Sequence, residues 1–219
     1  MKTMPHMPLD APQRRVLVLF PGALGDFICF LPALSILMED SRVDLLARAE
    51  FGDLVSPAVY VASLERYEIR RLFVAGAQGD QRVRDFFARY ASVYSWMGSS
   101  VPDFVRELRS VSQERVRFFP FRPRGQTVHQ RDYYLACLGE PNENPPRTAI
   151  ALEREALAWR DHFWRERSLG GRAVLTLAPG SGAREKNWPI HFYRAVAEWW
   201  RQTAQGAATP AAHKTVKEG

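Results

Sequence analysis

The sequence has few of the residues that mark disulfide-rich and metal-binding proteins. Its two cysteines, Cys29 and Cys137, lie far apart in apolar surroundings. A disulfide framework or a cysteine-based metal site needs more cysteines at tighter spacing, so both are interpreted as packing residues. The five histidines show no H-x-x-x-H or comparable spacing, so no dedicated metal site is expected.

Long hydrophobic runs are also missing. The longest apolar run, residues 27–38, has 12 residues and contains Pro32. Spanning a bilayer takes roughly 20 residues, so this run is predicted to be a buried element. Residues 1–15 lack the apolar region of a secretory signal and are expected to form a flexible N-terminal arm. The sequence therefore predicts a cytoplasmic protein.

Three familiar motifs of nucleotide-binding and hydrolytic enzymes do not occur. The G-x-x-x-x-G-K-[ST] loop and the G-x-S-x-G elbow are absent, and G-x-G-x-x-G is absent because Gly22 and Gly25 lack the leading glycine. These absences argue against a P-loop nucleotidase and an α/β-hydrolase. A dinucleotide-dependent oxidoreductase stays as a minor alternative, because Asp44 and Glu50 lie where a ribose-binding carboxylate would fall.

Positive charge is in excess, with a formal net charge of +6. Such a surface attracts nucleic acid, anionic lipid headgroups or phosphorylated sugars, and a merely solvated face explains it equally well. No nucleic-acid-binding signature accompanies the charge, so nucleic acid is not an expected partner. The basic clusters contain Arg14, Arg15, Arg115, Arg117, Arg122 and Arg124.

Residues 16–140 alternate between strand-like and helix-like segments. Residues 16–20 (VLVLF) form an apolar, β-branched run typical of a buried strand. A glycine-containing loop leads into a helix in which Pro32 marks either a kink or the start of regular helix. About five βα units follow from this alternation, which predicts one α/β domain with a mainly parallel, Rossmann-like sheet. Further strands are predicted at 43–47, 69–74, 92–97 and 115–119, and helices at 50–55, 82–90, 103–108 and 127–138, the last ended by Gly139.

The chain then opens a second unit of the same kind. Residues 141–146 (PNENPP) read as a linker, and an apolar stripe predicts a helix over 152–168. A strand at 173–178, a loop and a helix over 189–201 follow, with Pro189 suited to the first helical turn. We therefore expect a linker and inter-domain helix at 141–171, an incomplete second domain at 172–202, and a disordered tail at 203–219.

The loop of this second unit has the composition of a phosphate site. Gly180 and Gly182 allow close backbone approach, Ser181 adds a hydroxyl, Lys186 adds a cation, and a helix N-terminus follows. A phosphate or pyrophosphate fits this set. The alternative is a strand-to-helix turn that needs small residues, with Lys186 simply solvated.

The first loop has glycines and a carboxylate instead. Gly22 and Gly25 precede Asp26 at the start of the helix. Asp26 is either a general base that takes a proton from an attacking hydroxyl or a helix cap worth about 0.5–2 kcal/mol. His129 and Asp132 near the last helix of the domain are assigned capping or surface roles in preference to a role in a cleft.

Two segments resemble those of a known enzyme family. The segment VLVLFPGALGDFICFLPALSIL resembles the N-terminal signature of glycosyltransferase family nine, the ADP-heptose:lipopolysaccharide heptosyltransferases. The segment LTLAPGSGAREKNWPIHFYRAVAEW resembles the second signature of that family, and the two occur in the right order about one domain apart. The resemblance implies a GT-B fold of two Rossmann-like domains and inverting transfer of heptose to lipopolysaccharide, without a cofactor or an obligatory metal.

The resemblance also implies roles for individual residues. Asp26 corresponds to the proposed base of the family and Lys186 to its donor-phosphate lysine, while Ser181 and Gly182 correspond to small donor-loop residues. Gly22 and Gly25 are the expected substrate-binding residues of the first loop. The expected partners are a nucleotide sugar such as ADP-heptose and a lipopolysaccharide-type acceptor.

Two departures from the family pattern limit these roles. Pro21, Gly22 and Ala23 stand where the heptosyltransferases usually have a serine-rich loop, which leaves the acceptor open. The second domain of the family continues with further βα units, so the chain reads as C-terminally truncated, and a catalytically inactive binding module is the alternative. The basic surface is expected to touch the inner face of the cytoplasmic membrane transiently.

Overall fold

The computed structural model describes residues 14–123, 125, 127–139, 150, 152, 154–180 and 184–203. These residues belong to two compact units, one ending at Leu152 and the other beginning at Glu153. Each unit is described by itself.

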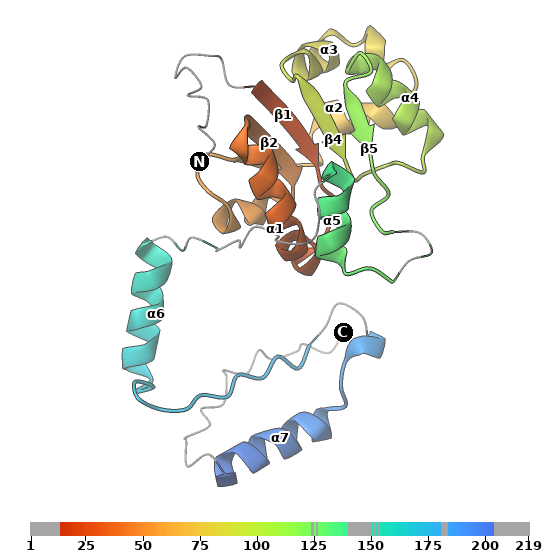
Figure 1. The fold of residues 1–219 in the computed structure, drawn as a ribbon. Coiled ribbons are helices and arrows are strands. Elements are labelled where there is room, and N and C mark those ends of the chain that lie inside the picture. The colour runs from red at the N-terminus through yellow and green to blue at the C-terminus, as the bar shows by residue number, and fades with distance from the viewer. Residues whose placement is uncertain are drawn as a thin grey trace, which may run out of the picture. The chain divides into compact units, whose positions relative to one another are not determined.

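The first unit is built on a five-stranded parallel sheet in the order β3-β2-β1-β4-β5 (Figure 1). The chain starts at β1 in the centre, fills one side of the sheet and then the other, which is the doubly wound arrangement. The expectation of an α/β fold with a mainly parallel sheet is therefore confirmed. The strands are β1 (Arg14–Leu19), β2 (Ser41–Ala47), β3 (Tyr60–Ser63), β4 (Ser92–Ser95) and β5 (Val116–Phe118).

Side chains of the central strand alternate between two hydrophobic clusters, as period-two geometry requires. Val16 and Val18 belong to the cluster that also includes residues of α1 (Leu24–Glu39) and α5 (Gln130–Leu138). Leu17 and Leu19 belong to the cluster that includes residues of α3 (Gln81–Ala88) and α4 (Pro102–Val111). Both faces of the sheet are therefore covered, which explains why the strand sequence is a continuous apolar run.

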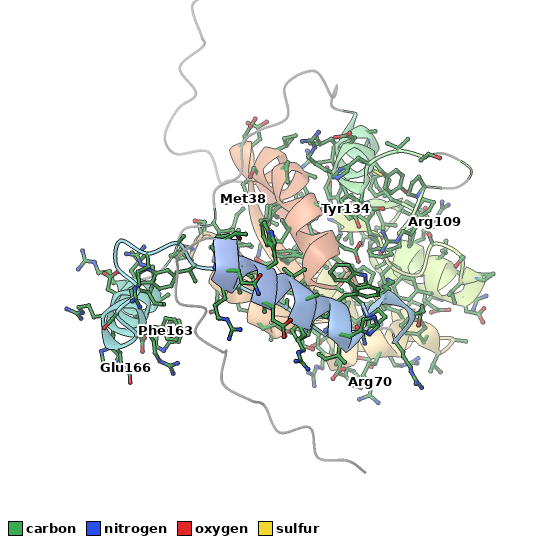
Figure 2. All side chains as sticks on the ribbon, turned by 90° about the horizontal axis from the view of Figure 1, so that it is seen from below. Met38, Arg70, Arg109, Tyr134, Phe163 and Glu166 are labelled. Atoms are coloured by element: carbon green, nitrogen blue, oxygen red, sulfur yellow. The ribbon has the colours of Figure 1, made fainter. Side chains whose placement is uncertain are left out.

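Helix α1 is regular from its first residue, Leu24, although it contains Pro32. The alternative that regular helix starts only near Pro32 is therefore wrong. Helix α5 lies beside α1, and Tyr134 is carried on α5 (Figure 2). Its buried ring packs edge-on against Phe20 and Phe30 with centroid distances of 5.6 and 5.5 Å.

One predicted strand of the first unit is wrong. Residues 69–73 form the end of helix α2 (Tyr67–Arg70) and the 3-10 helix η2 (Arg71–Phe73), and the third strand is β3 instead. Ile69 and Leu72 are both buried and three residues apart, so the apolar spacing is helical, not alternating. The other short helices are η1 (Ala49–Leu54) and η3 (Ala77–Gly79).

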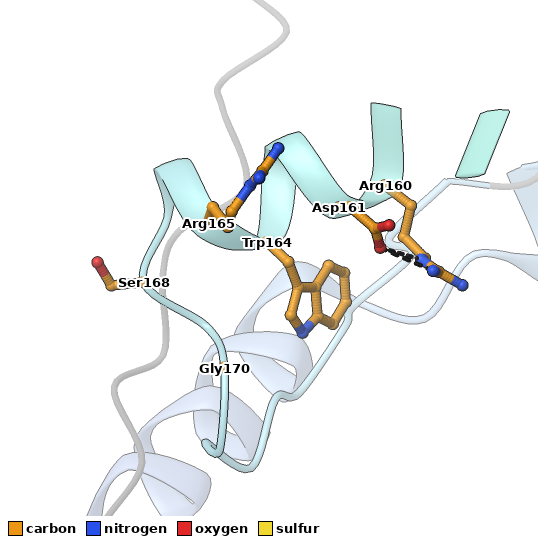
Figure 3. A pocket seen from close by; sticks show the side chains of 6 residues that line it. All are labelled: Arg160, Asp161, Trp164, Arg165, Ser168 and Gly170. Atoms are coloured by element: carbon orange, nitrogen blue, oxygen red, sulfur yellow. Dashed lines mark hydrogen bonds and ion pairs between the residues drawn. The ribbon is translucent and has the colours of Figure 1, made fainter. Parts of the chain in front are cut away.

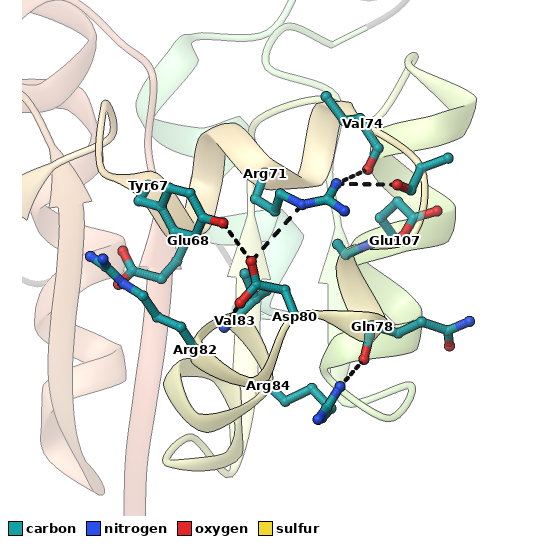
Figure 4. A network of polar contacts seen from close by, with 12 residues as sticks. Tyr67, Glu68, Arg71, Val74, Gln78, Asp80, Arg82, Val83, Arg84 and Glu107 are labelled. Carbon is teal, nitrogen blue, oxygen red and sulfur yellow. Dashed lines mark hydrogen bonds and ion pairs between the residues drawn. The ribbon is translucent and has the colours of Figure 1, made fainter.

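A network of polar contacts ties these helices together (Figure 4). Asp80 caps α3 by accepting from the Val83 N–H at 3.3 Å, and it also accepts from the Tyr67 hydroxyl. The nearly buried carboxylate of Glu68 accepts from Nε of Arg66 and Nε of Arg82, each at 3.0 Å. Burial alone would raise the pKa of Glu68, but hydrogen bonds from the backbone and from both arginines lower it overall.

Both ends of α5 follow the local expectations. His129 is the N-cap, and its Nδ1 accepts from the Arg131 N–H at 3.2 Å, which confirms its capping role. Asp132 lies in the first turn and pairs with Arg131 Nε at 2.7 Å. Gly139 follows the last turn with φ +85°, the left-handed conformation that glycine adopts easily.

The second unit contains helices α6 (Arg154–Glu166) and α7 (Ile190–Thr203) and the 3-10 helix η4 (Arg184–Lys186). The predicted strand at 173–178 is wrong, because these residues have no regular secondary structure. A parallel strand requires a neighbour for its N–H and C=O groups, and the described residues of this unit include no other strand. Several large apolar side chains of the unit are exposed, among them Trp159, Ile190 and Trp199.

No helix among the described residues is long and apolar enough to cross a membrane.

Candidate functional site

The topology of the sheet indicates where a ligand would bind in the first unit. Strands β1 and β4 are neighbours, yet the chain leaves β1 toward β2 on one side and β4 toward β5 on the other. In doubly wound sheets the crevice for ligands lies outside the carboxyl ends of the strands at this switch point. The Trp96 N–H donates to the Leu19 carbonyl at 3.0 Å, so the loops that follow β1 and β4 start side by side there.

Gly22 lies in the loop after β1, where a side chain would not fit. A Cβ on Gly22 would lie 2.4 Å from a ring carbon of Phe20 and 2.9 Å from the Cβ of Asp26. The Phe20 ring cannot easily yield, because it is buried and stacked on Phe30 at 4.5 Å. Glycine at this position therefore brings the loop close to Asp26. Gly25 is exposed, with open space where a Cβ would be.

Asp26 lies in the first turn of α1, as the third helical residue. The N-cap is Ala23, which offers no side-chain cap, so the interpretation of Asp26 as the capping residue is wrong. A carboxylate in the first turn still interacts favourably with the helix dipole, by about 0.3–1 kcal/mol. Its side chain keeps 17% of its surface exposed, so it is accessible at the carboxyl edge of the sheet.

Arg122 forms an ion pair with Asp26, with 2.8 Å between Nη2 and Oδ1. Arg122 comes from the loop after β5. This loop leaves the sheet at Phe119, whose N–H donates to the Ser95 carbonyl at 2.9 Å. The site therefore combines residues that follow two different strands. The sequence showed Arg122 only as part of a basic cluster, and no local pattern indicated its contact with Asp26.

Helix α5 holds the loop that carries Arg122. Gln130 accepts from Nη1 of Arg122 at 3.2 Å through Oε1 and donates to the Phe121 carbonyl at 3.0 Å through Nε2. The Tyr133 hydroxyl donates to the Pro120 carbonyl. The guanidinium of Arg122 also lies 5.1 Å from the centre of the Phe121 ring, a distance at which a cation is attracted to an aromatic ring. The position of Arg122 is therefore fixed by several contacts.

Tyr134 adds a buried phenol beneath this group. Burial raises the pKa of Tyr134, Gln130 and the charge of Arg122 act to lower it, and the charge of Asp26 acts to raise it. The phenol therefore stays neutral, and Asp26 and Arg122 are the charged groups at this edge that lie close to it.

The residues predicted for the donor loop lie in the second unit or outside the described residues. Lys186 is the last residue of η4 and is exposed. Ser181 and Gly182 lie outside the described residues. The structure therefore brings together Gly22, Gly25 and Asp26 in the first unit, while Lys186 belongs to the other unit.

A surface hollow of about 690 Å³ lies in the second unit and contains none of the predicted site residues (Figure 3). Two of its lining side chains, Arg160 and Asp161, pair with each other at 2.7 Å. The hollow is lined by residues of α6 and of the segment that follows it. The remaining lining residues are Trp164, Arg165, Ser168 and Gly170.

Asp44 and Glu50, the two carboxylates considered for a dinucleotide-dependent oxidoreductase, do not lie where a ribose-binding carboxylate would. Asp44 is 1% exposed within β2, and its Oδ2 accepts from Arg15 Nη2 at 2.6 Å and from the Tyr90 hydroxyl at 2.8 Å. Asp44 is therefore an internal structural residue. Glu50 is exposed in η1 and lies 4.0 Å from Arg48.

In the part of the chain that the structure describes, no group of three or more histidine, cysteine, aspartate or glutamate side chains could hold a metal ion.

No protein-family model matches this chain, and no curated protein matches it either. Two solved structures of a heptosyltransferase, WaaC from E. coli, do match it. The structure with ADP-2-deoxy-2-fluoro heptose is 19% identical and covers 87% of this chain, with a TM-score of 0.45. The structure with ADP is also 19% identical and covers 87%, with a TM-score of 0.46. The chain spans 66% and 65% of the length of the WaaC chain in these two structures.

Proposed function

We propose that the chain belongs to the GT-B glycosyltransferases, with the first unit as the acceptor-binding domain and the second as the beginning of the donor-binding domain. The reaction is inverting transfer of a sugar, heptose from ADP-heptose, to a lipopolysaccharide or related cell-envelope acceptor. The observation that carries this proposal is the place of Asp26, an accessible carboxylate in the first turn of α1 at the switch point of a doubly wound sheet. The two sequence segments that resemble glycosyltransferase family nine supply the substrate class.

In this reaction Asp26 acts as the general base. Its carboxylate takes the proton of an acceptor hydroxyl while the oxygen attacks the anomeric carbon of the sugar. The bond between that carbon and the ADP oxygen breaks on the opposite face, so the configuration inverts. Lys186, Ser181 and Gly182 stabilise the charge that develops on the departing ADP. No metal ion or cofactor takes part.

The proposed location is the cytoplasm, with transient contact to the inner face of the cytoplasmic membrane. Arg117 is exposed on the edge strand β5. Basic residues near an anionic leaflet contribute about 1 kcal/mol each, so such contact is weak and reversible. Nucleic acid is not a proposed partner.

The test of the proposed reaction compares the 219-residue chain with its Asp26→Asn variant. Sugar transfer from ADP-heptose to heptose-free lipopolysaccharide is followed by mass spectrometry of the product and by release of ADP. Asp26→Asn should lower the rate by about 10²–10⁴-fold, the usual contribution of a general base, while binding of the nucleotide sugar stays nearly intact. Turnover of the variant near that of the original chain would contradict the role of Asp26.

A second candidate function is a catalytically inactive binding module. The observation that favours it is the missing strand at 173–178, because the donor loop then follows an irregular segment. Calorimetry with ADP separates the two candidates. A working donor site should lose about 1.5–3 kcal/mol of binding free energy in Lys186→Ala, the range for charge-assisted hydrogen bonds. Equal and negligible ADP binding by both proteins would favour the binding module.

A further inference from the structure

We infer that Arg122 and Gln130 are positioning residues for Asp26, and that they set which oxygen of its carboxylate faces the acceptor. This inference rests on the proposed function for its catalytic meaning, while its structural content concerns the first unit alone. Neither residue is indicated by a motif in the sequence. The three side chains form a connected series, which we call the Gln130–Arg122–Asp26 chain.

The contacts of Asp26 are unequal at its two carboxylate oxygens. Oδ1 is the carboxylate oxygen closest to Arg122, 2.8 Å from Nη2, and no side-chain hydrogen bond to Oδ2 is seen within the described ranges. Oδ1 is thus held by a cation and Oδ2 is left to accept a proton. A general base must point one oxygen at the hydroxyl that it deprotonates, and this pairing fixes the rotation of the carboxylate.

Arg122 can hold the Asp26 carboxylate in one orientation because the second terminal nitrogen of its guanidinium, Nη1, is itself held. Nη1 donates to Oε1 of Gln130 at 3.2 Å, and Nε2 of the same amide donates to the Phe121 carbonyl at 3.0 Å. Gln130 is the first residue of α5, which packs against α1. The amide therefore links the loop after β5 to the helix layer in which Asp26 lies.

The packing below the loop keeps Gln130 and Asp26, the two ends of the Gln130–Arg122–Asp26 chain, at a fixed distance. The Phe121 ring lies edge-on to the buried Phe20 ring at 5.9 Å, and Phe20 lies under Gly22 beside Asp26. Arg122 itself is 60% exposed, and an exposed arginine side chain would otherwise sample many rotamers. The hydrogen bond to Gln130 restricts that freedom, so loss of Gln130 should act on Asp26 without touching it.

Chemical labelling of carboxylates tests the Gln130–Arg122–Asp26 chain without requiring sugar-transfer activity. The 219-residue chain is treated with a water-soluble carbodiimide and glycinamide, and the rate of labelling at Asp26 is read by mass spectrometry. Arg122→Gln should raise this rate by about two- to fivefold, the factor that corresponds to a partly exposed ion pair. Gln130→Ala should raise it by a smaller factor, and Arg122→Lys should restore most of the original rate.

The matched control is Arg106→Gln, which removes an exposed ion pair of similar length, 2.7 Å between Arg106 Nη1 and Asp103 Oδ1 on α4, together with a contact of 3.3 Å between Arg106 Nε and Glu107 Oε1. It should raise labelling at Asp103 and leave Asp26 unchanged. Hydrogen exchange in β1 shows whether each variant keeps the sheet. If Arg122→Gln loses that protection, the labelling rates at Asp26 in Gln130→Ala and Arg122→Lys test the inference instead.

A transfer assay then separates positioning from a purely structural role. The Arg122→Gln variant should lower kcat while KM for the nucleotide sugar stays the same, with partial recovery in Arg122→Lys. Labelling at Asp26 that is equal in the original chain, Arg122→Gln and Gln130→Ala would overturn the inference. Changed labelling with no transfer by the original chain would leave the positioning intact and count against the proposed function instead.

Discussion

Residues 14–26 in the first unit and residues 173–190 in the second have the same kind of sequence but different structures. Each has an apolar run, a Pro-Gly pair, a short loop and a helix. In the first unit the run is β1, which pairs with β2 on one side and β4 on the other. In the second unit the run has no regular structure. The difference lies in the neighbours, because the hydrogen-bond ladder of a parallel strand needs another strand, and without one its N–H and C=O groups are left to side chains or water.

The same difference extends to the loops and helices that follow. In the first unit the loop after β1 packs tightly, with Gly22 against Phe20, and α1 is covered by α5. In the second unit a Cβ on Gly180 would meet nothing within 4 Å, and no side chain of α7 is fully buried. Asp26, the proposed base, therefore lies on a closely packed support, whereas Lys186 does not.

The largest expected effect in this comparison comes from one pair of matched substitutions. Val18→Ala in β1 removes part of a fully buried side chain and should lower the free energy of unfolding by about 1.5–3 kcal/mol. Val174→Ala acts on a side chain that is 39% exposed. It should change the free energy of unfolding by less than about 0.5 kcal/mol. Urea unfolding of both variants measures the difference. Similar losses would show that residues 173–178 are packed as firmly as β1.

A second pair compares the two Pro-Gly loops. Gly22→Ala forces a methyl group against Phe20 and Asp26, and overpacking of this kind costs about 1–3 kcal/mol. Gly180→Ala meets open space and should be close to neutral, with a change of about 0.5 kcal/mol or less. The midpoints of thermal unfolding check both values. If Gly22→Ala were as stable as the original chain, the close approach of the first loop to Asp26 would be in doubt.

A smaller effect on the free energy of unfolding is expected when the buried carboxylate of Glu68 or the exposed carboxylate of Asp161 is replaced. The pKa of Glu68 is lowered from 4.5 in the folded protein. Its ionised form therefore stabilises the fold above pH ~4.5, and this contribution is lost as the pH falls through the lowered pKa. In Glu68→Gln, urea unfolding should show a smaller loss of stability between pH 6 and pH 3. The control Asp161→Asn removes an exposed pair of the second unit and should have little effect.

The sequence predicted most of the sheet of the first unit but only part of its site. Strands with continuous apolar runs, such as β1 and β2, were placed nearly to the residue, as was Gly139 at the end of α5. The four-residue β3 was missed because so short an element carries little periodicity, and 69–74 was misread because a few apolar residues fit a strand or a helix. Asp26 was found from its motif. Its contacts with Arg122 could not be found, because they depend on which strands are neighbours.

The error at 173–178 has a different cause. The segment has the composition of a buried strand, and the prediction rested on this composition alone. Propensity for β structure is largely a matter of packing against neighbours. The described residues of the second unit provide none, so the strand does not form.

Amide hydrogen exchange of the 219-residue chain tests this account most directly. We expect strong protection of Leu17 and Leu19, which are buried and paired within the sheet, and exchange near the rate of an unfolded chain at Leu175 and Leu177. This result would show that one sequence pattern forms a strand only where neighbours exist, and that the first unit folds without a sheet in the second. Equal protection of the two segments in a monomer would contradict it.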